Sequence, residues 1–342
     1  MDITPSITTV DHDGTATIST LHYDIIQTHI LTRLDGPTLA STACTSSELH
    51  ALSSDHTLWS NICQSTWPST NTPHVKELVS TFPDGPRSFF SDSFPHLITN
   101  SNRSISAANL SIDQVPELIS AVDVFYKGKL IFSKVVETET VSGWFRCSPF
   151  RVDLLDPKDV VPTPIKYPNG EDTCLELADE ITLSWIVIDP NGRRAMNLSS
   201  HKPVSVYRHW LSGEIQIRFA SILAGGERGS SSEFVQCGIV VTCKGSEGGD
   251  LKVREVSLLV EDMDGMHLKG RESLVILQRA LEGEKVKRGR RDEEGRKRYE
   301  EYLERKRERK ERKVRTEGAL DMMCAVFGVL AFSSFGFFMI CR

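Results

Sequence analysis

The sequence predicts an α+β chain that begins with a unit of three short helices. A mainly antiparallel β-sandwich-like domain, a charged helix and a C-terminal transmembrane helix are expected to follow. Three observations support this order. Apolar residues recur at steps of three and four near the start, β-branched residues dominate the middle, and a charged run precedes an uncharged apolar run at the end. The length of 342 residues is enough for two domains.

The helical pattern covers residues 18–67, after a leader, residues 1–17, that we expect to be disordered. Gly36 and Pro37 end the first helix, and Thr38 is a candidate cap for the second, which we expect to run on to Leu52. A third helix is expected to begin near Thr57. The first helix places the following apolar residues on one face: Ile25, Ile26, Ile30, Leu31 and Leu34.

The middle of the chain is predicted to be β-structure from residue 116 to 283, closed by an amphipathic helix over residues 270–283. Alternating apolar residues separated by turns such as Lys127-Gly128 are typical of antiparallel sandwiches or barrels. Residues 68–115 are rich in Ser, Thr, Pro and Asn with interspersed Phe, which predicts an irregular linker anchored by aromatic side chains.

The end of the chain divides by charge. The net charge is −6, yet residues 284–315 contain 16 Lys/Arg and 9 Asp/Glu, a local balance of +7. We expect residues 284–318 to form a solvated charged helix, supported by pairs such as Glu301–Arg305 and Glu308–Arg312. Its interleaved acidic residues argue against nucleic acid as a partner, because tracking of phosphates needs unopposed positive charge.

No pattern in the chain indicates catalysis, a cofactor or a metal. The sequence has no nucleophile elbow, phosphate-binding loop, zinc-protease or dinucleotide-binding motif. The eight cysteines show no metal-ligand spacing, and Cys237 and Cys243 are expected to pack as small apolar residues of a reduced protein. The sequence therefore predicts a non-enzymatic chain that functions by binding.

The N-terminal helical unit opens with Leu21, contains the Ile30-Leu31 pair and closes with Leu58-Trp59. In this order of apolar residues it resembles the F-box. His22 stands where that family usually has Pro, and Leu49 stands where an aromatic residue is common. The remainder of the chain is similar to a plant F-box subgroup. The matching positions run from the opening leucine to the closing Leu-Trp pair: Leu21, Asp24, Ile30, Leu31, Leu34, Leu39, Cys44, Leu52, Leu58 and Trp59.

The resemblance implies a non-catalytic substrate receptor of a cullin-based (SCF-type) ubiquitin ligase. The helical unit would dock on a Skp-type adaptor and, through it, on a cullin, while the β domain would hold a protein substrate. Physical reasoning agrees, since about fifty residues of helix bury too little surface to be secure alone and can complete their core on a partner. The implied adaptor-binding residues are Leu21, Ile26, Ile30, Leu31, Leu34, Leu39, Cys44, Leu52, Leu58 and Trp59.

Residues 319–341 are expected to form a tail anchor on the cytosolic face of a membrane. Twenty apolar residues span about 30 Å as a helix, which matches the hydrocarbon core, and the preceding basic residues favour the cytosol. The residues expected to face lipid are Met322, Phe327, Leu330, Phe335, Phe338 and Ile340. Three alternatives stay open: a buried core helix, a soluble cytoplasmic or nuclear protein, and a membrane-anchored binding or scaffold module with a lectin-like β domain.

Overall fold

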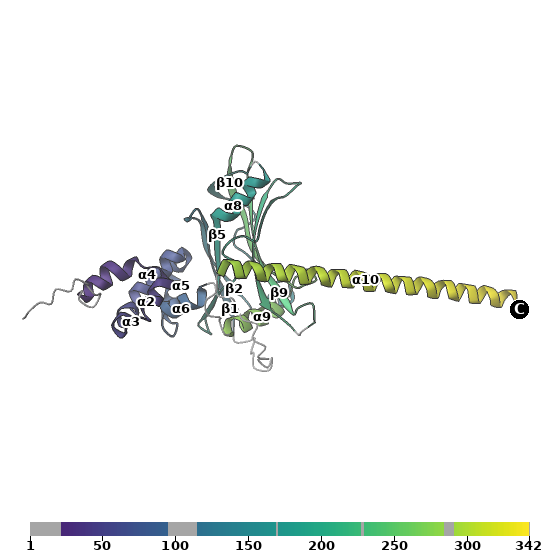
Figure 1. Cartoon of the computed structure of the whole chain (residues 1–342), viewed down its shortest axis with the longest axis horizontal. Helices are drawn as coiled ribbons and strands as arrows, with labels where there is room; N and C mark the ends of the chain where they lie inside the picture. Colours follow the sequence, from purple (N-terminus) through teal and green to yellow (C-terminus); the bar gives the residue numbers. More distant parts are fainter. Residues whose placement is uncertain (1–21, 95–114, 169, 227–228, 284–290, 342) are drawn as a thin grey trace, which may run out of the picture. The chain divides into compact units, whose positions relative to one another are not determined.

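The structure is a computed structural model that describes residues 22–94, 115–168, 170–226, 229–283 and 291–341 (Figure 1). The expected leader and Leu21 lie outside these residues, as do residues 95–114 of the expected linker and the first residues of the charged segment. The chain divides into two compact units, residues 1–63 and residues 64–342.

The first unit is helical, as the sequence predicts. Asp35, rather than Thr38, caps the helix that follows the Gly36-Pro37 break, because its carboxylate accepts the Thr38 N–H at 2.9 Å. The predicted second helix is two helices, since Ser46 begins a new one by accepting the Leu49 N–H. The elements are α1 (Tyr23–Ile25), η2 (Ile26–Ile30), η3 (Leu31–Arg33), α2 (Gly36–Thr42), α3 (Ser47–Ser53) and α4 (His56–Thr66).

The prediction of an irregular linker from residue 68 is wrong for residues 68–93. They form η4 (Pro68–Asn71), α5 (Pro73–Ser80) and α6 (Pro86–Ser93). Each of these helices has a proline in its first turn, where the missing N–H costs nothing, so these prolines start helices instead of breaking them. Aromatic rings hold the three together: Phe89 makes edge-to-face contacts with Trp67 and Phe82.

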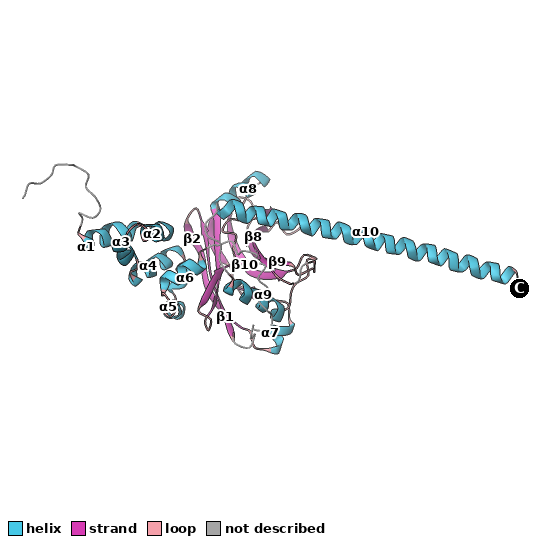
Figure 2. Ribbon diagram, turned by 60° about the horizontal axis from the view of Figure 1, so that its bottom comes forward, coloured by secondary structure: helices cyan, strands magenta, loops and turns pink. Residues whose placement is uncertain are grey.

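Two antiparallel sheets form the second unit, as predicted (Figure 2). The first sheet has the order β2-β1-β5-β6, and the second has the order β3-β10-β9-β8-β7, with β4 also paired to β10. The strands are β1 (Glu117–Tyr126), β2 (Lys129–Glu139), β3 (Arg151–Asp153), β4 (Val161–Lys166), β5 (Ile181–Asp189), β6 (Arg194–Asn197), β7 (Ser205–Arg208), β8 (Ile215–Ala224), β9 (Phe234–Lys244) and β10 (Asp250–Glu261).

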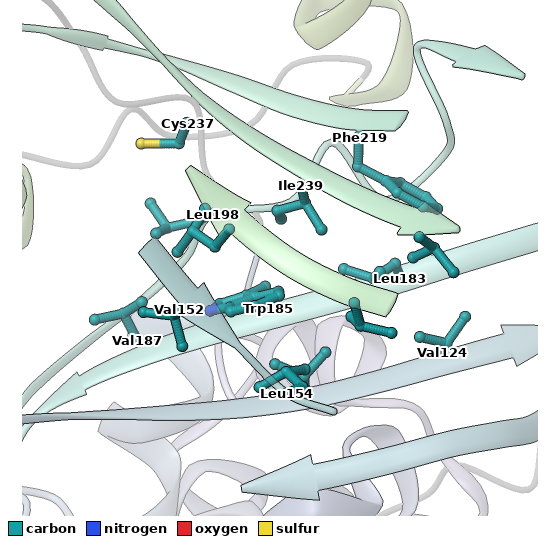
Figure 3. Packing of buried hydrophobic residues seen from close by; sticks show 14 of the residues in the cluster. Val124, Val152, Leu154, Leu183, Trp185, Val187, Leu198, Phe219, Cys237 and Ile239 are labelled. Carbon is teal, nitrogen blue, oxygen red and sulfur yellow. The ribbon is translucent and has the colours of Figure 1, made fainter. Parts of the chain in front are cut away.

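The core lies between the inner faces of the sheets. Trp185 of β5 is fully buried there, and its Nε1 donates to the hydroxyl of Ser120 at 3.2 Å. Figure 3 shows Trp185 among side chains from both sheets, including Phe219 and Cys237. Cys237 and Cys243 are fully buried, and burial raises the pKa of each thiol to about 12, so both pack as apolar residues as expected.

Four further helices accompany the sheets: α7 (Gly143–Cys147), α8 (Glu171–Glu180), α9 (Gly270–Glu282) and α10 (Arg291–Ile340). The predicted closing helix is α9, which packs Leu274, Leu277 and Leu281 into the core between the sheets. The predicted charged and transmembrane segments belong to one helix, α10. The α+β fold class is confirmed.

The outer face of the first sheet is contacted by η4 and α6. Ile119 and Asp123 of β1 are fully buried although they point away from the core between the sheets. The Asp123 carboxylate accepts the Ser69 N–H at 2.9 Å, the Ser69 hydroxyl at 2.5 Å and the Ser133 hydroxyl at 2.7 Å. Burial raises the pKa of Asp123, against the opposing effect of these hydrogen bonds. The carboxylate fastens η4 to the sheet.

We expect Asp123→Ala to lower the free energy of unfolding by about 1–3 kcal/mol, because the Ser69 N–H is left buried without an acceptor. Urea unfolding of the full chain, followed by circular dichroism, measures the change. Ser133→Ala is the control, since it removes one of the three donors to Asp123 and leaves the Ser69 N–H with its acceptor. Equal stability of Asp123→Ala and the native chain would contradict this account of the contact.

Candidate functional site

Residues 23–33 form the first helical stretch of the N-terminal unit and present two different faces. Ile26 and Leu31 are buried at 3% and 1% exposure. Tyr23, Ile25 and Ile30 are exposed at 52%, 45% and 38%. The stretch passes through α-, π- and 3₁₀-helical turns, so the directions of its side chains do not follow a single helical period. It therefore contributes to a core and leaves apolar side chains at the surface.

The core of this unit is built from the following helices. Leu39 of α2 and Leu58 of α4 are buried, and Trp59 of α4 is 2% exposed. The Trp59 indole Nε1 donates to the carbonyl oxygen of Ser53 at 2.7 Å, which satisfies its one polar group and joins α3 to α4. Trp59 thus holds the unit together from inside.

Two aspartates fix where helices begin. Hydrogen bonds from Thr38 lower the pKa of Asp35. Hydrogen bonds from Thr57 and from the Leu58 N–H lower the pKa of Asp55, which also accepts a bond from Gln27 Nε2 at 3.4 Å. The Gln27 contact connects the first helical stretch to the start of α4.

The residues expected to bind the adaptor are distributed across both environments. The structure brings five into the buried core, namely Ile26, Leu31, Leu39, Leu58 and Trp59. Leu34 and Leu52 are partly buried, whereas Ile30 and Cys44 are exposed and Leu21 lies outside the described residues. The exposed Tyr23 and Ile25 were not among the expected residues. The adjacent isoleucines at 25 and 26 were the available signal, because neighbours in a helix cannot both face inward.

The first part of α10 is docked on the β domain. Tyr302 is 2% exposed, and its hydroxyl donates to the carbonyl oxygen of Asp262, just after β10, at 3.2 Å. Arg309 Nε lies 3.0 Å from Oδ1 of Asp264, and Arg309 Nη1 donates to the Gly229 carbonyl oxygen at 3.1 Å. Lys306 faces Glu261 at 3.9 Å. The charged helix is therefore a packed element over these residues and not a solvated spacer.

The last part of α10, in contrast, is apolar and is not packed against the rest of the described chain. Of the helices in the described ranges, it is the one long and apolar enough, by length and composition, to cross a membrane. Every residue named as lipid-facing is exposed: Met322, Phe327, Leu330, Phe335, Phe338 and Ile340. This excludes a buried core helix in the chain on its own.

Known proteins match the chain over nearly its whole length. The probable F-box protein At2g36090 of Arabidopsis thaliana is 49% identical over 330 residues, which is 96% of this chain and 93% of that protein. The chain belongs to the plant F-box protein family. The F-box proteins At2g27310 and At3g44326 of the same plant are 46% and 45% identical, covering 95% and 88% of the chain and 96% and 84% of their own lengths.

These matches extend well beyond the F-box-like unit. A match over 96% of the chain includes most of the β domain and of α10, so the similarity to this relative is not confined to one motif. No family model matches the chain, and no solved structure matches it.

Tyr302 makes the docking of α10 sensitive to alkaline pH. Burial raises its pKa above the ordinary value of about 10, so the folded state favours the neutral phenol. The stabilisation is fully present below about pH 10 and is lost as the pH rises through the higher folded pKa. We expect Tyr302→Phe to cost about 1 kcal/mol at pH 8 and to differ less from the native chain above pH 10.

Urea unfolding of both proteins between pH 8 and pH 11.5 measures this difference. Tyr23→Phe is the matched control, because Tyr23 is 52% exposed. A difference between Tyr302→Phe and the native chain that stays constant with pH would rule out a titrating contact at Tyr302.

Proposed function

We propose that this F-box protein is the substrate-receptor subunit of a cullin-based ubiquitin ligase held at a membrane surface. The N-terminal unit docks on a Skp-type adaptor, the β domain, residues 116–283, receives the protein substrate, and residues 319–341 anchor the chain in lipid. The observation that carries the proposal is the pairing of family membership with exposed apolar residues on the first helical stretch. Surface residues of this kind fit a partner helix groove.

No covalent chemistry on this chain is required by the proposal. The receptor acts by proximity, because a target held on the same assembly as the conjugating enzyme reacts at a high effective concentration. A binding protein suffices for that role. The geometry needed is a firm docking unit at one site and a separate binding domain at another.

Burial divides the adaptor site into contacts and supports. We assign the direct contacts to Tyr23, Ile25 and Ile30, with Leu34 and Leu52 at the margin. The buried Leu31, Leu39, Leu58 and Trp59 act as supports that hold these contacts in place. A charge introduced at Leu31 would therefore unfold the unit and could not report on docking.

We expect Ile25→Lys with Ile30→Lys to reduce capture of a Skp-type adaptor by about tenfold or more, because two apolar contacts become charges that cannot be desolvated. Capture from purified components, quantified by surface plasmon resonance, measures the loss. Thr45→Lys is the matched control, since Thr45 is also exposed on this unit but lies outside the proposed contacts. Circular dichroism confirms that each variant is folded. Native binding by the double variant would refute the assigned contacts.

The anchor is tested separately. We expect the full chain to stay with membranes through extraction at high pH and a chain ending at residue 318 to be released, because about twenty apolar residues exchange water for hydrocarbon only in the full chain. Fractionation and immunoblotting measure the distribution. Release of the full chain would instead support the soluble alternative.

A further inference from the structure

A pocket of about 370 Å³ lies where α10 docks on the β domain. One wall is α10, and the others are the loop and strand start between β8 and β9 and the turn after β10. The pocket is lined by Gly229, Glu233, Phe234, Met263, Arg305, Arg309 and Arg312. Three arginines on one helix therefore face a space with an apolar floor.

The arginines share a face because they are spaced by four and three residues on α10. The sequence predicted that Arg305 and Arg312 would pair with Glu301 and Glu308 along the helix. In the described residues neither ion pair forms. The Arg305 guanidinium lies 4.8 Å from the centre of the Phe234 ring, and Arg312 Nε donates to the Glu308 carbonyl oxygen at 3.4 Å.

Other arginines of α10 behave as solvated helix residues. Arg296 pairs with Glu300 at 3.1 Å, and Arg307 lies 3.9 Å from Glu304 and from Glu311. The contrast shows that two populations of arginine share α10. Arg296 and Arg307 lie close to glutamates of α10 itself. Arg305, Arg309 and Arg312 line the pocket against the β domain.

The charges around the pocket do not balance. Arg309 is paired with Asp264. Glu233 keeps its negative charge, because the Gly229 N–H that its carboxylate accepts at 2.7 Å is neutral. Three arginines therefore face two carboxylates at the pocket. Within the described ranges, Arg305 and Arg312 have no carboxylate within ion-pair distance. Two guanidinium groups thus have donors available for an anion. Guanidinium donors match the geometry of phosphate oxygens. Phe234 and Met263 can contact an apolar part of the same ligand next to its phosphate.

We propose that this pocket binds a phosphate-bearing anion through Arg305 and Arg312. The phosphate can belong to a lipid headgroup or to a soluble phosphate compound. Arg312 precedes Met322 by ten residues, about 15 Å of helix, so a large phosphorylated headgroup could reach the pocket if the anchor lies in a bilayer. The lipid source rests on the proposed anchor, whereas the soluble source does not.

The first experiment uses the full chain in detergent micelles with pyrophosphate as the probe, measured by isothermal titration calorimetry. We expect saturable binding that Arg305→Gln with Arg312→Gln weakens by about tenfold or more. Arg296→Gln with Arg307→Gln is the control that removes the same charge from the outward face, and it should bind like the native chain. No saturable binding, or equal weakening in both double variants, would overturn the proposal.

Docking of α10 is checked in the same samples. Hydrogen exchange around Tyr302 should be unchanged in Arg305→Gln with Arg312→Gln, because Tyr302 and Arg309 are retained. Arg305→Lys with Arg312→Lys keeps the charge without the planar fork and should bind with intermediate affinity. Binding by the Gln variant equal to that of the Lys variant would also count against a guanidinium site.

The second experiment separates the two sources. The full chain is placed in phosphatidylcholine nanodiscs with or without phosphatidylinositol 4-phosphate, and hydrogen exchange is followed at residues 229–234 and 305–312. Protection that needs the phosphorylated lipid and blocks pyrophosphate binding supports the lipid source. Pyrophosphate binding without a lipid effect supports the soluble source. The experiment in detergent micelles depends on neither adaptor docking nor membrane insertion, so failure of the pocket and failure of the proposed function remain distinguishable.

Discussion

The second unit depends on one apolar core shared by two antiparallel sheets. Trp185, Phe219 and Ile239 meet there from opposite sheets. α9 packs into the same core, whereas other helices attach to the sandwich from outside. The helices of residues 68–93 are fastened by the Asp123 carboxylate, and α10 is fastened by the Tyr302 hydroxyl. Each fastening satisfies buried polar groups, which makes the position of the attached helix specific where apolar contact alone would not.

The N-terminal unit uses a different division of its apolar residues. Buried leucines and Trp59 organise the helices, while Tyr23, Ile25 and Ile30 stay at the surface. A small unit has too little interior to hide every apolar side chain, so those left outside favour contact with another protein. In the proposed function, stability and partner recognition therefore depend on different residues of the N-terminal unit.

The α+β class, the helical start, the antiparallel sheets and α9 could all be predicted from periodicity and turn residues, although the second of the three expected helices is two helices. The helices of residues 68–93 could not, because Pro68, Pro73 and Pro86 are equally compatible with irregular structure and with helix starts. Likewise, the sequence pattern predicts Thr38 as the cap of α2, whereas the structure shows that the Asp35 carboxylate accepts the Thr38 N–H. The exposed positions of the N-terminal unit could not be predicted from a regular helical period, because the first helical stretch contains π- and 3₁₀-helical turns. The arginine pocket depends on contacts between residues some 80 positions apart, such as Arg309 with Gly229, that no local pattern encodes.

The unbroken course of α10 has a mechanical consequence. Residues 291–340 contain no proline, and the same helix that packs Tyr302 against the β domain continues to Ile340. The apolar end and the segment docked on the β domain therefore belong to one continuous helix, with no break between them at which the two could turn independently. In the proposed function, with that end in a bilayer, the depth of its insertion would set the distance of the β domain from the lipid surface, since the helix rises about 1.5 Å per residue.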